Sequence, residues 1–248
     1  MTTLQDQLAA QLQSKSLPVS STWLSTFLST GTHQRTPLPA LTKTALFRLL
    51  NTDFRESLTP RSSTSTLPVD IFDPNVQERL LSGPIPLQVL DIDDIGTSIW
   101  NQVEAIERVE RGEAVRGREI VRTVDLGDAQ DGDGGSSRSG NAGLNGNANE
   151  SNGPHRLILQ DAKGTRAVGI EMARIDGVGI GQLPIGGKLL LKNATVARGM
   201  ILLTPESVTL LGGKIEAMDL AWRAGRKARL LEKITGTGTE TRTGRGGA

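Results

Sequence analysis

The 248-residue sequence contains no cysteine and no tyrosine. The absence of cysteine excludes a disulfide framework, thiolate zinc sites and cysteine nucleophiles. Stability must therefore come from the burial of apolar side chains, and a chain of this length is long enough to bury a substantial core. Because tyrosine and cysteine are both missing, we expect no nuclease or topoisomerase activity of the chain's own.

Histidine is scarce as well, since His33 and His155 are the only two in the sequence. Two histidines are too few for a histidine-based metal cluster or for most acid–base constellations. His33 lies in a Thr/Pro-rich turn and His155 follows Gly153-Pro154, so we expect both to be exposed loop residues. The sequence therefore predicts no metal, no cofactor and no catalytic residue.

Two glycine clusters imitate nucleotide-binding motifs without meeting their requirements. Residues 186–189 (GGKL) lack the earlier glycine of a P-loop, because that position holds Gln182, and Leu189 replaces the hydroxyl residue that binds Mg²⁺. The glycines of 177–181 fail the dinucleotide pattern, since Gln182 and Pro184 follow them. We therefore expect no ATPase activity and interpret both clusters as tight turns or close backbone approaches.

Neither bulk charge nor long apolar runs are present. Lys and Arg number 28 against 27 Asp and Glu, so any contact with nucleic acid must be local rather than an effect of net charge. The N-terminus has no basic region ahead of an apolar stretch, and no apolar run reaches the roughly 18 residues of a membrane span. We expect a soluble, intracellular protein that does not bind a membrane.

Residues 1–60 carry three short apolar stripes of helical spacing. Leu4, Leu8 and Leu12 recur every four residues; a second stripe follows the capping residues 20–22, and a third runs through residues 41–54 after a proline-rich break. No such short helix buries its stripe alone, so the pattern predicts a three-helix bundle. We expect its core to contain the aromatic residues Trp23, Phe27, Phe47 and Phe54. The alternative is that these aromatic residues line a groove that binds a peptide.

A composition change separates this bundle from the rest of the chain. Residues 57–70 are rich in Ser, Thr and Pro with little to bury, so we expect an extended linker, placed at 61–84. From residue 85 the apolar residues alternate or run together as in strands. Strands are expected at 85–92, 156–160, 165–173, 187–192, 195–203 and 208–211, with a short helical turn within 176–184.

Five or six short antiparallel strands with one short helix suggest an OB barrel over 85–234, so the fold class is α+β. The barrel is interrupted after its first strand. Residues 98–111 are helix-capable, 113–124 are weakly strand-like, and 127–153 are nearly all Gly, Asn, Ser and Asp. We expect 111–153 to be a largely disordered insertion. Asp93 and Asp94 before it fit a turn or N-cap, with a divalent-metal site as the alternative.

The chain ends with a basic helix at 218–234 and a flexible tail at 235–248. Basic residues interleave with Trp222, Leu230 and Leu231, so we expect the apolar side to pack on the protein. The basic side would then face solvent, DNA or a partner. We expect that replacing its Arg and Lys residues leaves stability almost unchanged.

The block from residue 157 to 218 carries a dense order of short motifs. They are a strand, an Asp-containing turn, a strand ending in Ile170-Glu171, Leu183-Pro184, Gly187-Lys188, Arg198-Gly199, and 203–206 (LTPE) before 211–213 (LGG). This order resembles the OB fold of the RecQ-mediated genome instability protein 1 family, in the short fungal form with one OB domain. Residues 50–55 (LNTDFR) and 86–90 (PLQVL) are similar to the family's third helix and first OB strand. The resemblance covers nearly the whole chain except 111–153, where the family carries a variable insertion.

The resemblance implies a nuclear, non-catalytic adaptor that binds topoisomerase III, joins it to a RecQ-type helicase and favours dissolution of double Holliday junctions. In the family the insertion reaches the topoisomerase gate. Partner-binding residues are therefore expected on the insertion and barrel, at Ile99, Trp100, Val103, Val115, Ile120, Val121 and Lys188. Lys188, next to Gly186-Gly187, is open to a partner's backbone or is a plain exposed lysine at a strand end.

The alternative is an OB module whose main role is direct binding of single-stranded or junction DNA. Its cationic patch would contain Lys192, Arg198, Arg223, Arg226, Lys227 and Arg229. A barrel with few aromatic residues lacks the stacking platform that single-strand binding normally uses. The sequence therefore favours a protein partner over DNA.

Overall fold

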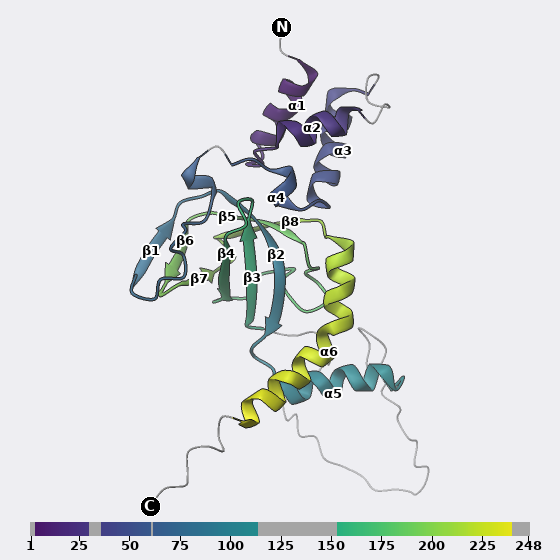
Figure 1. Ribbon diagram of the computed structural model, residues 1–248, viewed down its shortest axis with the longest axis vertical. Coiled ribbons are helices and arrows are strands. Elements are labelled where there is room, and N and C mark those ends of the chain that lie inside the picture. Colours follow the sequence, from purple (N-terminus) through teal and green to yellow (C-terminus); the bar gives the residue numbers. More distant parts are fainter. Residues whose placement is uncertain (1–2, 30–35, 61, 114–152, 240–248) are drawn as a thin grey trace, which may run out of the picture.

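The computed structural model describes residues 3–29, 36–60, 62–113 and 153–239. A group of N-terminal helices lies at one end of a strongly curled sheet, and the C-terminal helix runs along the side of the sheet toward its other end (Figure 1). The expected insertion, 111–153, lies almost entirely outside the described residues, as do His33 and the tail from residue 240.

The N-terminal domain consists of α1 (Leu4–Gln13), α2 (Ser21–Ser29), α3 (Leu38–Leu50) and the single turn α4 (Phe54–Ser57). A capping box between Thr3 and Asp6 starts α1, and the Asp53 carboxylate caps α4. The three predicted helices are confirmed. Phe47 is a correction, because it is 69% exposed. It lies off the i, i+4, i+8 stripe of Leu41, Ala45 and Leu49, which faces the core.

The segment expected to be a linker packs on the barrel instead of being extended. Its short 3-10 turn, η2 (Ser63–Ser65), leads to Leu67 and Ile71, which are buried in the barrel's core cluster. The backbone N–H of Leu67 donates to the Asp161 carboxylate at 2.9 Å. A strand follows at β1 (Glu78–Leu81), so the barrel's packing begins well before residue 85.

The eight-stranded sheet has the order β1-β6-β7-β4-β3-β2-β5-β8. Its strands after β1 are β2 (Ile85–Asp94), β3 (His155–Asp161), β4 (Arg166–Glu171), β5 (Lys188–Leu191), β6 (Ala194–Ala197), β7 (Met200–Leu203) and β8 (Val208–Gly212). All neighbours are antiparallel except β4 and β7. The α+β class and the barrel are therefore confirmed.

Two details of the barrel differ from the sequence expectation. Residues 195–203, expected to form one strand, form the hairpin β6–β7, because Arg198 and Gly199 adopt positive φ angles of 46° and 83°. Residues 176–184 form turns rather than a helical turn. The positive φ angles of Gly177 and Gly181 there suit turns and not a helix.

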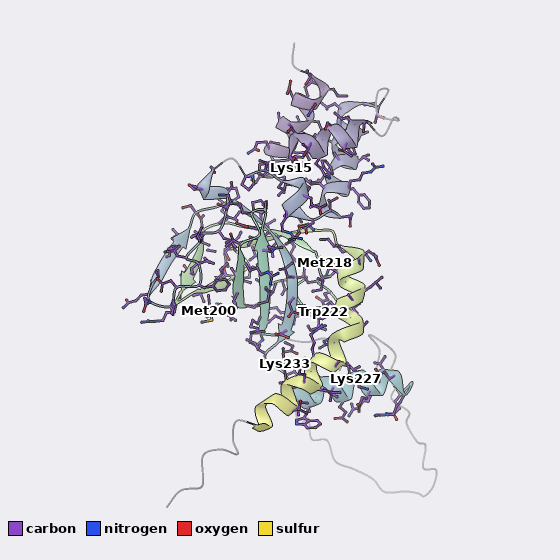
Figure 2. All side chains as sticks on the ribbon, viewed as in Figure 1. Lys15, Met200, Met218, Trp222, Lys227 and Lys233 are labelled. Carbon is purple, nitrogen blue, oxygen red and sulfur yellow. The ribbon has the colours of Figure 1, made fainter. Side chains whose placement is uncertain are left out.

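Two further helices lie outside the sheet and contact each other. They are α5 (Ile99–Glu110), which follows β2, and α6 (Glu216–Thr239), which follows β8. Met218 and Trp222 of α6 pack against the barrel core, and Figure 2 shows both on the side of α6 toward the strands. Within the described residues, no helix is long and apolar enough to span a membrane.

Candidate functional site

The base of the insertion is a tightly closed end of the β2–β3 hairpin. The two strands remain paired as far as Asp94 and His155, and the N–H of Ile95 donates to the Pro154 carbonyl at 3.0 Å. A Cβ atom added to Gly96 would lie 2.3 Å from the Gly153 carbonyl oxygen, so only glycine fits there. The residues on the two sides of the insertion therefore leave the barrel at one place.

His155 is not the exposed loop residue that the sequence suggested. It is 2% exposed, and its Nδ1 lies 2.5 Å from Oε2 of Glu171, which is also buried. Glu171 further accepts hydrogen bonds from the N–H groups of His155 and Ile175. The burial of His155 could have been predicted from the alternation of side chains along β3, because His155 lies on the same inward face as Leu157 and Leu159.

The acidic residues at the end of β2 serve local structure. Oδ1 of Asp94 accepts hydrogen bonds from the N–H groups of Gly96 and Thr97, which is the expected turn. Asp93 accepts from Arg156 at 2.6 Å and Lys233 at 2.8 Å. Burial raises the pKa of Asp93, but these two hydrogen bonds outweigh burial, so its pKa lies below the ordinary value. The described residues contain no group of three or more acidic or histidine side chains placed to hold a metal ion.

Helix α5 carries the first of the predicted partner-binding residues. Ser98 caps the helix, and the side chains of Gln102 and Val103 within it are buried. Val103 is 4% exposed and so unavailable to a partner, whereas Trp100 is 65% exposed and Ile99 is partly exposed. Val115, Ile120 and Val121 lie outside the described residues. Trp100 is thus the member of this set that the structure presents on the surface.

Two basic side chains of α6 contact α5 instead of facing outward. Arg226 donates to the Gln102 amide oxygen at 3.1 Å, and Lys227 contacts two glutamates of α5, with Glu110 at 2.6 Å. These contacts join α6 to α5. The expectation that this face is free is wrong for Lys227, because α5 supplies its acidic partners.

The other two basic residues of α6 act within the helix. Arg223 pairs with the buried Asp219 at 2.8 Å, and Arg229 donates to the Trp222 carbonyl. The guanidinium of Arg229 also lies over the Trp222 ring, whose Nε1 donates to Asp91. Leu230 is buried as expected, whereas Leu231 is 38% exposed.

Lys192 and Arg198 lie outside α6, after β5 and between β6 and β7. Both side chains are exposed, and Arg198 occupies the β6–β7 turn, with a hydrogen bond of 3.3 Å to the Pro74 carbonyl. Met200, which follows this turn, lies on the opposite side of the barrel from Lys227 (Figure 2). The residues proposed to contact nucleic acid are thus not brought into one patch, and their binding stays a prediction.

Lys188 is fully buried, which corrects both sequence interpretations of it. Its Nζ donates to the Gly186 carbonyl at 2.5 Å and lies 5.0 Å from the centre of the Phe54 ring. Burial lowers the pKa of Lys188 to about 8, against a smaller opposite effect of the Asp53 charge. Because Phe54 and Asp53 belong to the helical domain, Lys188 lies at the junction between this domain and the barrel.

The same junction contains further close contacts. Gln88 of β2 accepts from the Phe54 N–H and donates to Asp53, while a Cβ on Gly213 would lie 2.3 Å from the Leu50 carbonyl oxygen. A groove beside it has a volume of about 410 Å³. It is lined by Asp53, Arg55, Gln88, Leu90, Asp91, Ile158, Gln160, Arg166 and Met218. This groove could not be predicted from the sequence, because its lining residues come from five separate elements, α4, β2, β3, β4 and α6.

These features define an OB-fold protein that is fused to an N-terminal helical domain and carries an insertion between its first two barrel strands. Comparison with known families agrees. Residues 12–57 match the model described as "RMI1, N-terminal helical domain", and residues 63–226 match "RMI1, N-terminal OB-fold domain".

A curated relative extends this agreement. The chain is 32% identical over 197 residues to the RecQ-mediated genome instability protein 1 of Schizosaccharomyces pombe, covering 78% of this chain and 79% of the relative. The chain belongs to the RecQ-mediated genome instability protein 1 family.

Proposed function

We propose that this protein is a nuclear, non-catalytic adaptor and regulator of topoisomerase III in a RecQ-helicase pathway. It would promote the dissolution of double Holliday junctions and thereby genome stability. The observation that carries the proposal is the family match over both domains, in the same order and on both sides of the insertion. The link to a RecQ pathway rests on the name of the S. pombe relative.

The surface chemistry supports a protein partner over DNA as the main ligand. Four candidate cations, Arg223, Arg226, Lys227 and Arg229, are engaged in contacts within the protein. DNA affinity depends on Lys and Arg side chains that neutralise phosphates and release counterions. Cations that already donate to carboxylate or carbonyl oxygens within the protein gain less from a phosphate.

The insertion is the part to which we assign regulation. It follows α5, which contacts α6, and the backbone on its two sides comes together at Gly96 and Gly153. A segment fixed in this way starts from a defined position on the barrel and extends toward a bound partner. In this proposal residues 114–126, with Val115, Ile120 and Val121, contact topoisomerase III near its gate, and 127–152 add length only.

Two deletions test this assignment, each with a flexible Gly/Ser linker replacing the deleted residues. Both retain Gly153, because its backbone closes the base of the insertion. Deletion of 127–152 should leave topoisomerase III binding and stimulation of decatenation unchanged. Deletion of 114–152 should leave folding and binding unchanged but abolish stimulation.

Co-purification of the intact chain with tagged topoisomerase III from the same organism is the first measurement. Failure of the purified proteins to associate would contradict the adaptor function itself. Full stimulation by the 114–152 deletion would contradict only the role given to 114–126.

A further inference from the structure

The outward face of the curled sheet carries a band of side chains across five strands, all apolar except for one threonine. The register places Leu80, Thr195, Leu202 and Ile170 in one row, and Ala197, Met200, Val168 and Ile158 in the next. We call these eight residues the outer band. Their neighbours along each strand, such as Leu157, Ala167 and Ile201, point into the core.

The outer band is exposed to solvent. Leu80 is 64% and Met200 43% exposed, and the six other members are partly exposed. None of the eight belongs to the barrel's core cluster or to the partly buried residues packed on it. Figure 1 shows α6 along β2 and β8, at the other end of the strand order from β1, β6 and β7. A contiguous aliphatic surface of this kind marks an interaction site.

The band continues into the groove beside the helical domain. Ile158 belongs to both, and Arg166, paired with Gln160 in the register, stands at the groove's rim. The other rim cation, Arg55, is paired with Asp53 at 2.8 Å. The Arg166 guanidinium has no hydrogen bond or ion pair with any residue that the structure describes. Asp91 in the lining already accepts two hydrogen bonds from within the protein, so the unpaired Arg166 is the charge that favours an acidic group of a partner.

The geometry points to an amphipathic helix of a protein partner as the occupant, with its aliphatic face on the outer band and an acidic residue at Arg166. An extended peptide laid on this face would bury unpaired backbone N–H and C=O groups, whereas a helix satisfies its own. Four strand spacings of about 4.8 Å span about 19 Å, the length of about 13 helical residues. The eight residues of the outer band include no aromatic ring for base stacking, which disfavours single-stranded DNA as the ligand of the band.

The test uses the full chain and, as probe, purified topoisomerase III of the same organism, so it rests on the proposed function. Met200→Asp places a charge in the outer band, and Arg166→Glu reverses the charge at the groove. Phe47→Asp is the matched control, because Phe47 is an exposed apolar residue of α3 outside the band. Unchanged melting temperatures and circular dichroism show that each variant is folded; if Met200→Asp is not, Val168→Thr replaces it as the near-isosteric substitution.

Isothermal titration calorimetry should show about a tenfold or larger rise in Kd for Met200→Asp and for Arg166→Glu, and less than about a twofold change for Phe47→Asp. Wild-type affinity in both outer-face variants overturns the inference and leaves the proposed function intact. If Arg166→Glu alone binds with wild-type affinity, the claim that an acidic residue of the partner binds at Arg166 is overturned. No binding by the wild-type chain overturns the proposed function and the inference together. Loss of single-stranded DNA binding in Met200→Asp, with topoisomerase binding retained, overturns the choice of a protein helix.

Discussion

The buried ammonium group of Lys188 should give the protein an unusual dependence of stability on pH. It is fully buried, with one hydrogen bond to the Gly186 carbonyl and the Phe54 ring beneath it. Burial lowers its pKa from the ordinary 10.5 to about 8, while Asp53 opposes this shift. Solvent replaces these surroundings in the unfolded chain, where the pKa returns to its ordinary value.

The sign of the effect follows from which state holds the proton. Between pH 8 and 10.5 the unfolded chain retains a proton that the folded protein has released, so the free energy of unfolding rises with pH. The slope reaches about 1.4 kcal/mol per pH unit, and the whole gain is about 3 kcal/mol. Below pH 8 both states are protonated, and Lys188 contributes its full unfavourable desolvation. Tyrosine and cysteine, which would titrate in the same window, are absent from the sequence.

Urea unfolding of the wild-type chain and of Lys188→Met at about pH 7.5, 9 and 10 measures this contribution. Methionine fills a similar volume without a charge, so the stability of the variant should lack the rise assigned to Lys188. Lys192→Met is the control, because Lys192 is exposed four positions further along the chain. Its curve should run parallel to the wild-type curve. If the wild-type and Lys188→Met curves are parallel as well, the ammonium group is not desolvated as argued.

Three further changes test other parts of the structure. Glu171→Ala removes the acceptor of three hydrogen bonds at the base of the insertion and should cost about 3 kcal/mol in urea unfolding; a cost below about 1 kcal/mol would contradict the assigned role. Gly213→Ala should lower the melting temperature more than Gly212→Ala, because both have positive φ but only Gly213 abuts the Leu50 carbonyl; equal losses would mean that the junction relaxes. Lys227→Gln should speed amide hydrogen exchange in α5 with little change in global melting, and unchanged exchange would show that the ion pairs to Glu107 and Glu110 do not hold the helix.

The helices and most strands could be predicted because their signals are local. The stripe of Leu8 and Leu12 faces the core of the helical domain, and the alternation of Leu157 and Leu159 faces the core of the barrel. Periodicity of this kind depends only on which side of an element is buried. It is therefore present in the sequence before any tertiary contact forms.

Strand β1 and the packed linker could not be predicted in the same way. Glu78–Leu81 is four residues long and contains two charged side chains, and it becomes a strand by pairing with β6, more than a hundred residues later. Leu67 and Ile71 are isolated apolar residues in a Ser/Thr/Pro-rich stretch. Their burial depends on a barrel surface that other segments build.

The candidate site shows the same limit more strongly, because buried polar groups are defined by their partners. From the sequence alone, Lys188 is expected to be an exposed lysine at a strand end. In the folded protein the helical domain places Phe54 and Asp53 next to it. From the sequence alone, the basic residues of α6 are expected to form a free face. In the folded protein α5 supplies Glu107 and Glu110, which pair with Lys227. In both cases the sequence identified the residue and its charge, and only the assembled fold decided whether that charge remained available to a ligand.

The two ends of the barrel differ in how firmly they hold their helices, and this difference bears on regulation. The helical domain is held by buried groups, among them Lys188 and Gln88, whose exposure without partners would be costly. Helix α5 buries the Gln102 and Val103 side chains, and the ion pairs that join it to α6 are partly exposed and contribute little. Detachment of α5, which exposes two buried side chains, therefore costs less free energy than separation of the helical domain. The helix that leads into the insertion is the element that a bound partner can most readily move, while the barrel beneath it keeps its shape.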